Sequence, residues 1–114
     1  MINLGEYISA IDIFGKTVTC SEDQWNNHIV NGHTIMENNK DAVIDTISSP
    51  DFVFESSYNS NRMIFIKNSC SSTYYNSLLT KVIVQSNNDK EGEIVTAFPI
   101  KKIKGGIGNV VYPT

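Results

Sequence analysis

The sequence is short of the residues that build disulfide-rich, zinc-binding or fibrous proteins. Its 114 residues include two cysteines, three prolines and seven glycines. Cys20 and Cys70 are too few for a disulfide framework, and no CxxC or Cys/His spacing indicates a zinc site. We therefore expect two free thiols in a reducing compartment, and no metal.

Long hydrophobic runs are also missing. No segment approaches the roughly 20 apolar residues that a membrane-spanning helix needs. The N-terminus lacks the basic start and apolar stretch of a secretory signal, since the first lysine is Lys16. These absences predict a soluble protein without a membrane partner, either cytoplasmic or delivered to a target cell's cytoplasm as part of a larger toxin.

Positive charge is scarce, and the net charge is −3. This counts against a nucleic-acid enzyme, because phosphate binding usually leaves a basic footprint. The charges are uneven, however, since acids dominate the first half while Lys101, Lys102 and Lys104 gather near the end. An active site needs only such a local positive patch.

What remains is an ordinary globular composition, 40% hydrophobic and 18% charged, which predicts one folded domain over residues 1–114. Ser21 to Gln24 has the form of a capping box and predicts a helix that ends near Gly32. Trp25, His28 and Ile29 would share the buried face of this helix. A second short helix is predicted over about 37–47.

After Pro50 the pattern becomes extended. Alternating and β-branched residues predict strands at 52–54, 62–67, 78–85 and 93–98, with a short last strand at 110–112. We expect an α+β fold in which N-terminal helices pack on a roughly four-stranded antiparallel sheet.

His28 and His33 are the candidate proton-transfer residues, because imidazole gives and takes protons near neutral pH. The structural alternative is a hydrogen-bonded core histidine and a polar loop residue. Thr96 shares a strand face with Phe98 and can either supply a hydroxyl to a phosphate or serve only as a β-former.

The basic and aromatic residues also have two interpretations. Lys101, Lys102 and Lys104 either protect a strand edge or hold an RNA backbone. Arg62 and Lys81 lie in strands and either pair with an acid or serve a site. Tyr74, Tyr75 and Phe98 can stack on bases, although core packing is the expected role of Phe98.

An ordered series of segments resembles the phage-associated branch of the barnase–EndoU–colicin–RelE-like nucleases. The resemblance covers roughly residues 17–104. Members typically show W-x-x-H-I-x-x-x-H, then I-x-x-T-I-x-x-P-D-x-V, a strand with a basic residue, V-x-V and T-A-[FY]. The chain departs from the family at Thr34-Ile35, where Pro-Glu is usual, and at Tyr112, where Trp is usual. The matching segments are Trp25 to His33, Ile44 to Val53, Arg62 to Phe65, Lys81 to Val84 and Ile94 to Phe98.

The resemblance implies RNA cleavage without metal or cofactor, with transfer RNA one candidate substrate. The ribose 2′-OH attacks the adjacent phosphorus, which yields a 2′,3′-cyclic phosphate and a 5′-OH. A cognate inhibitor or immunity protein is an expected partner. By analogy, His28 and His33 transfer protons. The phosphate-stabilising residues would be Thr96, Arg62 and Lys81, and the RNA-binding residues Tyr75, Lys101, Lys102 and Lys104.

The alternative is a non-catalytic protein that keeps a nuclease-like fold, either an acidic inhibitor or immunity-type binder or a mobile-element protein. Acidic surfaces mimic nucleic acid, which suits the negative charge. The enzyme hypothesis requires His28, His33 and Thr96 around one cleft with a positive rim, whereas the binder hypothesis requires an exposed acidic face.

Overall fold

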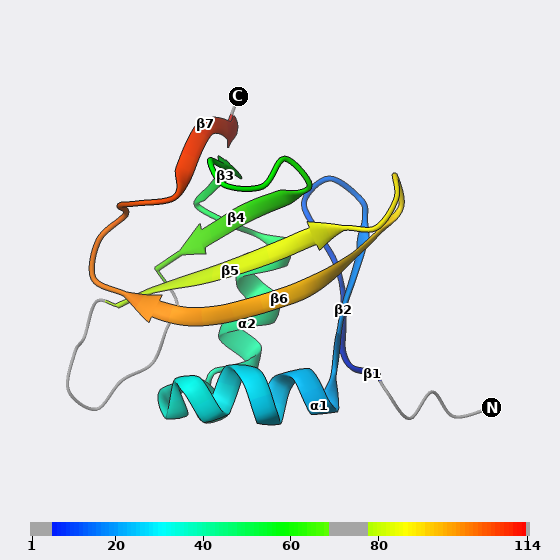
Figure 1. Ribbon diagram of the computed structural model, residues 1–114, viewed down its shortest axis with the longest axis vertical. Coiled ribbons are helices and arrows are strands. Elements are labelled where there is room, and N and C mark those ends of the chain that lie inside the picture. The colour runs from blue at the N-terminus through cyan, green and yellow to red at the C-terminus, as the bar shows by residue number, and fades with distance from the viewer. Residues whose placement is uncertain (1–5, 69–77, 114) are drawn as a thin grey trace.

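The computed structural model describes residues 6–68 and 78–113. Its core architecture is a seven-stranded sheet with the helical segment inserted between the second and third strands (Figure 1). In chain order the elements are β1 (Glu6–Ile11), β2 (Thr17–Ser21), α1 (Glu22–Gln24), η1 (Trp25–Val30), η2 (Thr34–Asn38), α2 (Lys40–Ser48), β3 (Phe52–Ser56), β4 (Arg62–Lys67), β5 (Leu79–Ser86), β6 (Glu91–Ile100) and β7 (Ile107–Tyr112).

The sheet is mixed. Its strand order is β1-β2-β6-β5-β4-β3-β7, and β2 runs parallel to β6 while the other neighbouring strands are antiparallel. The predicted fold class, N-terminal helices on a roughly four-stranded antiparallel sheet, is therefore wrong. The described residues are mostly sheet, and two strands precede the first helix.

The two N-terminal strands, which the predicted four-stranded sheet does not include, have a physical explanation. In β1 the side chains of Ile8 and Ala10 are buried while their neighbours are exposed, and in β2 Val18 and Cys20 alternate in the same way. Each strand thus carries the period-2 pattern of a half-buried strand. The pattern is only two buried residues long in each case and includes the small side chains of alanine and cysteine, so it is weak in the sequence.

The turn between β1 and β2 is built by Asp12. Its Oδ1 accepts hydrogen bonds from the backbone N–H groups of Phe14 and Lys16, each at 2.8 Å. Gly15 adopts a φ of 90°, a conformation that residues with a Cβ rarely adopt. The Asp12 carboxylate therefore serves as the hydrogen-bond acceptor for two backbone N–H groups of the turn.

The helical segment begins as predicted. Ser21 Oγ accepts a hydrogen bond from the backbone N–H of Gln24 at 3.0 Å, which caps the helix. The helix then widens into a π-turn over Trp25–Val30. The second helix, predicted over about 37–47, is α2, preceded by the 3₁₀ turn η2.

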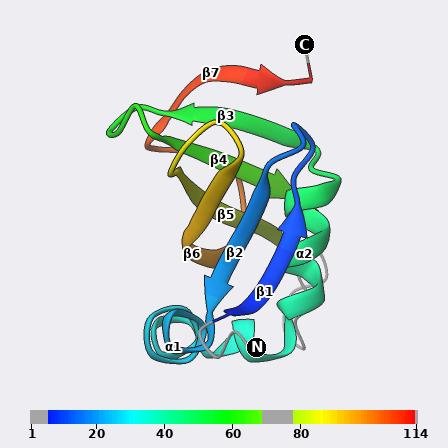
Figure 2. The same cartoon turned by 90° about the vertical axis from the view of Figure 1, so that its right-hand side faces the viewer.

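One face of the sheet packs against the helices. Figure 2 shows α2 running beside β1 while α1 lies across the end of β2, and the strands rotate strongly from β1 to β7. Trp25 and Ile29 enter the core from the first helix, and Val43 and Ile47 enter it from α2. None of the described helices is both long and apolar enough to cross a bilayer.

The burial of an isoleucine side chain predicts how much that side chain contributes to the free energy of unfolding. Ile47 is fully buried against the sheet, whereas Ile11 is 57% exposed at the end of the edge strand β1. Ile47→Ala should lower the free energy of unfolding by about 2–5 kcal/mol, because it leaves a cavity in the core. The matched Ile11→Ala should cost under about 1 kcal/mol. Urea unfolding of both variants measures this, and equal losses would contradict the packing described.

Candidate functional site

The candidate site lies on the face of the sheet that points away from the core, here called the outer face. On β5 the side chains of Val82 and Val84 are buried in the core, so Lys81 and Ile83 project to the outer face. Lys81 pairs with Phe98 and Ile83 with Thr96 on the adjacent strand β6. The register therefore places Lys81, Phe98 and Thr96 on one surface.

Phe98 is the centre of this surface. The ring of His33 stacks on the ring of Phe98, with 5.2 Å between centroids and an interplanar angle of 24°. The ammonium of Lys81 lies 5.3 Å from the same ring centroid. An imidazole, an aromatic ring and a cation are thus in one cluster, which we call the Phe98 cluster (Phe98, His33 and Lys81).

A β-bulge positions the helix that delivers His33. Ile83 pairs with Thr96, but the next residue, Val84, pairs with Ile94, so Val95 is an extra residue in β6. The side-chain amide of Gln24 donates a hydrogen bond to the carbonyl of Val95. This bond joins the start of the helix to the edge of β6, and nine residues later His33 reaches Phe98 on the same strand.

Lys81 is partly withdrawn from water. Its burial lowers the pKa of the ammonium below the ordinary value of 10.5, because the charged form loses hydration. The cation lies close to the Phe98 ring, whose π-face attracts positive charge. Lys81 is therefore less hydrated than a lysine on the open surface and lies beside the Phe98 ring.

His28 is exposed, so the prediction that it lies on the buried face of its helix is wrong. Trp25 and Ile29 occupy that face. The reason is the π-turn, whose wider spacing rotates residue i+3 away from the stripe formed by i and i+4. His28 lies four residues after Gln24, and therefore on the flank of the helix from which Gln24 reaches β6.

Arg62 lies on the outer face but outside the Phe98 cluster. It pairs with Gln85 across β4 and β5, and its Nε donates to Gln85 Oε1 at 3.2 Å. Gln85 is four residues from Lys81, which separates the two basic groups by roughly 13 Å along the strand. Arg62 is held by Gln85 at this distance from the Phe98 cluster.

The three predicted RNA-binding lysines follow the end of β6 at Ile100. Lys101, Lys102 and Lys104 are all exposed, in the segment that leads to β7. They lie at the end of β6 that carries Phe98. Tyr75, and Tyr74 beside it, lie outside the described residues.

Cys20 does not belong to the site. Its thiol is free and buried in the core, and burial together with the nearby Glu93 carboxylate raises its pKa to about 11. A thiol that stays protonated is a poor nucleophile and metal ligand. Within 6–68 and 78–113, no three His, Cys, Asp or Glu side chains form a group that could hold a metal ion.

Comparisons of the chain with protein-family models, curated proteins and solved structures give no match. Sequence reasoning named His33, Lys81 and Thr96 but assigned Phe98 chiefly to core packing. The alternation of side chains along the strand could have indicated otherwise. Ala97 faces the core, so the next residue, Phe98, points to the opposite face of the sheet.

The stacking of His33 on Phe98 has a spectroscopic consequence. A proton above an aromatic face is shielded, so the imidazole C–H resonances of His33 should lie upfield of those of His28. Phe98→Leu keeps an apolar side chain but removes the ring, and should move the His33 resonances downfield while those of His28 stay in place. Proton–carbon correlation NMR measures both. Unchanged His33 resonances in the Phe98→Leu variant would contradict the stacked geometry.

Proposed function

We propose that this protein is a metal-independent ribonuclease that cleaves RNA at the Phe98 cluster. The observation that carries the proposal is the joint placement of the His33 imidazole, the Phe98 ring and the Lys81 ammonium. The motif series over residues 17–104 supports placing the chain with the phage-associated barnase–EndoU–colicin–RelE-like nucleases.

Each group of the cluster suits one requirement of the reaction. RNA cleavage through the 2′-OH needs a base at that hydroxyl, an acid at the leaving 5′-oxygen and positive charge at the phosphate. His33 is an exposed imidazole able to exchange protons with a bound ribose. Lys81 supplies a positive charge near the same Phe98 ring, and Phe98 adds an aromatic edge near which an unpaired base can pack.

We assign each group a step in the proposed reaction. His33 removes the proton of the 2′-OH, and the oxygen forms a bond to the adjacent phosphorus. The bond from phosphorus to the 5′-oxygen breaks, and His28 donates a proton to that oxygen. Lys81 stabilises the charge that develops on the phosphate oxygens, and Thr96 donates a hydrogen bond from its hydroxyl. The products are a 2′,3′-cyclic phosphate and a 5′-OH.

The remaining basic residues fit flanking phosphates. Lys101, Lys102 and Lys104 follow the strand that carries Phe98, where they can hold the backbone on one side of the scissile bond. Arg62, on the outer face but distant from Lys81, is placed for a different phosphate. We therefore assign Arg62 to binding rather than to stabilisation of the reacting phosphate.

The cellular setting follows from the chemistry. A ribonuclease without a metal requirement would be active wherever RNA is exposed, in the cytoplasm of its own or of a target cell. A cognate inhibitor would protect the producing cell, and the exposed lysines at the end of β6 are the surface that an acidic inhibitor would cover.

The proposal is tested by cleavage of a single-stranded RNA in the presence of EDTA, with mass spectrometry of the products. His33→Ala and His28→Ala should each lower kcat/KM by about 10²-fold or more, because each removes one proton-transfer group. Lys81→Ala should lower it to a similar degree. Lys90→Ala, an exposed lysine on the β5–β6 turn, is the matched control and should leave the rate unchanged.

Thermal melting shows that each variant is folded. Full activity in both histidine variants would remove the proton-transfer roles. A wild-type protein that neither cleaves nor binds RNA would contradict the proposal and favour the acidic binder.

The lowered pKa of Lys81 predicts a pH dependence of RNA affinity. As pH rises toward 10.5, Lys81 loses its proton earlier than an ordinary lysine, so attraction to phosphate should decline below pH 10.5. Lys81→Arg keeps its charge throughout this range, and its decline should move to higher pH. Fluorescence anisotropy with a 2′-deoxy oligonucleotide measures affinity without cleavage. If the affinity of the two proteins declines over the same alkaline pH range, Lys81 does not bind the phosphate.

A further inference from the structure

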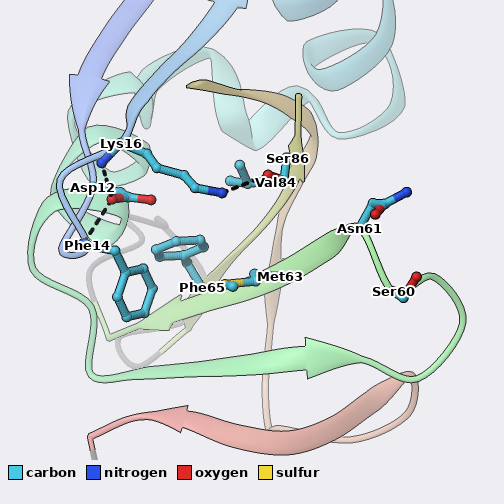
Figure 3. A pocket seen from close by; sticks show the side chains of 9 residues that line it. All are labelled: Asp12, Phe14, Lys16, Ser60, Asn61, Met63, Phe65, Val84 and Ser86. Atoms are coloured by element: carbon cyan, nitrogen blue, oxygen red, sulfur yellow. Dashed lines mark hydrogen bonds between the residues drawn. The ribbon is translucent and has the colours of Figure 1, made fainter. Parts of the chain in front are cut away.

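A pocket of about 240 Å³ opens on the core-facing side of the sheet, away from the outer face (Figure 3). It lies between the β1–β2 turn and the ends of β4 and β5. None of the residues assigned above to RNA chemistry lines it. The lining residues are Asp12, Phe14, Lys16, Ser60, Asn61, Met63, Phe65, Val84 and Ser86.

Asp12 presents a carboxylate oxygen to this pocket. The residue is only 6% exposed, and its Oδ1 is used by the two backbone N–H groups of the turn. Oδ2 has no hydrogen-bond partner within the described residues, although every fully buried side-chain oxygen and nitrogen there has one. Oδ2 therefore reaches the open space of the pocket, toward which Figure 3 shows the carboxylate pointing.

Lys16 brings a positive charge to the same pocket. Its Nζ donates a hydrogen bond to Ser86 Oγ at 2.7 Å, which leaves two N–H groups for another acceptor. In Figure 3 the lysine side chain passes above the Asp12 carboxylate and ends near Ser86. Among the described residues, neither Asp12 nor Lys16 has an ion-pair partner, and they do not pair with each other.

The rest of the pocket is apolar. Phe65 and Val84 are core residues at its base, and the Phe14 ring meets the Phe65 ring edge to face at 6.2 Å. Met63 continues this surface toward Asn61. The pocket therefore combines one free carboxylate oxygen, one ammonium and an apolar floor.

This combination selects among ligand classes. An anion would be opposed by Asp12, and a cation by Lys16. A neutral apolar molecule would strip water from both charges and return no hydrogen bonds. A molecule that carries both charges, with an apolar group beside them, satisfies every part of the lining.

We infer that this pocket binds a free α-amino acid with an apolar side chain. The ammonium of the amino acid donates to Asp12 Oδ2, and its carboxylate accepts from Lys16 Nζ. The side chain packs on Phe65, Met63 and Val84. The volume, below the roughly 300–1,000 Å³ of pockets for drug-sized ligands, suits a molecule of this size.

Isothermal titration calorimetry with L-leucine tests the inference, with isoamylamine and isocaproate as analogues that each lack one charged group. L-leucine should bind with a Kd of about 1 mM or below, and each analogue about tenfold more weakly or worse. Lys16→Met keeps the apolar stem of the lysine and should weaken L-leucine binding by about tenfold or more. Lys90→Met, outside the pocket, should bind as the wild type does.

Asp12→Asn keeps an oxygen for the two turn hydrogen bonds and should weaken binding to the same degree. Should that variant fail to fold, Lys16→Met and the two analogues still decide the question. Absence of heat with L-leucine would overturn the inference, and so would analogues that bind as tightly as the zwitterion. RNA cleavage is independent of this outcome, since the pocket and the Phe98 cluster lie on opposite faces of the sheet.

Discussion

The position of His33 on the outer face depends on how the first helix is attached to β6, where the side-chain amide of Gln24 donates a hydrogen bond to the carbonyl of Val95. β2 pairs with only the first residues of β6, from Glu91 to Glu93, so the edge of β6 beyond them is open to another partner. The bulge at Val95 presents a carbonyl at this edge, and the helix that follows β2 supplies the donor. With its start joined to β6, the helix runs along the strand and brings His33 to Phe98. Together with the burial of Trp25 and Ile29 in the core, this bond holds the helix that presents His33 to Phe98.

Part of the fold could be predicted from the sequence, because some signals are local. Ser21 and Gln24 form a cap by contacts within one turn, and the strands β3 to β6 each have a run of apolar or β-branched residues. The short strands β1 and β2 have weak patterns and become strands by pairing with each other and with β6. Parallel pairing of β2 with β6 joins segments about seventy residues apart, which no local pattern encodes.

The features of the candidate site also divide into those that a local sequence pattern predicts and those that depend on long-range pairing. The sequence identifies histidine, lysine and threonine as chemically capable, and strand parity predicts that Thr96 and Phe98 share a face. It does not predict that Lys81 lies opposite Phe98, because that pairing depends on the register of β5 against β6. The exposure of His28 depends on a π-turn, and the distance of Arg62 from Lys81 depends on which residues of β4 and β5 are paired. Each of these features depends on the folded structure, and no local sequence pattern predicts it.

The charge distribution is compatible with the proposed binding of RNA by a chain whose net charge is −3. β6 begins at exposed acids, Glu91 and Glu93, and is followed beyond Ile100 by exposed lysines, of which Lys101 is the first. The segment from Glu91 to Lys101 spans roughly 30 Å of extended chain. The Debye length at physiological ionic strength is about 8 Å, so the acids at one end scarcely reduce the positive potential at the other. The Phe98 cluster lies toward the lysine end of β6, so the proposed substrate would bind closer to these lysines than to Glu91 and Glu93.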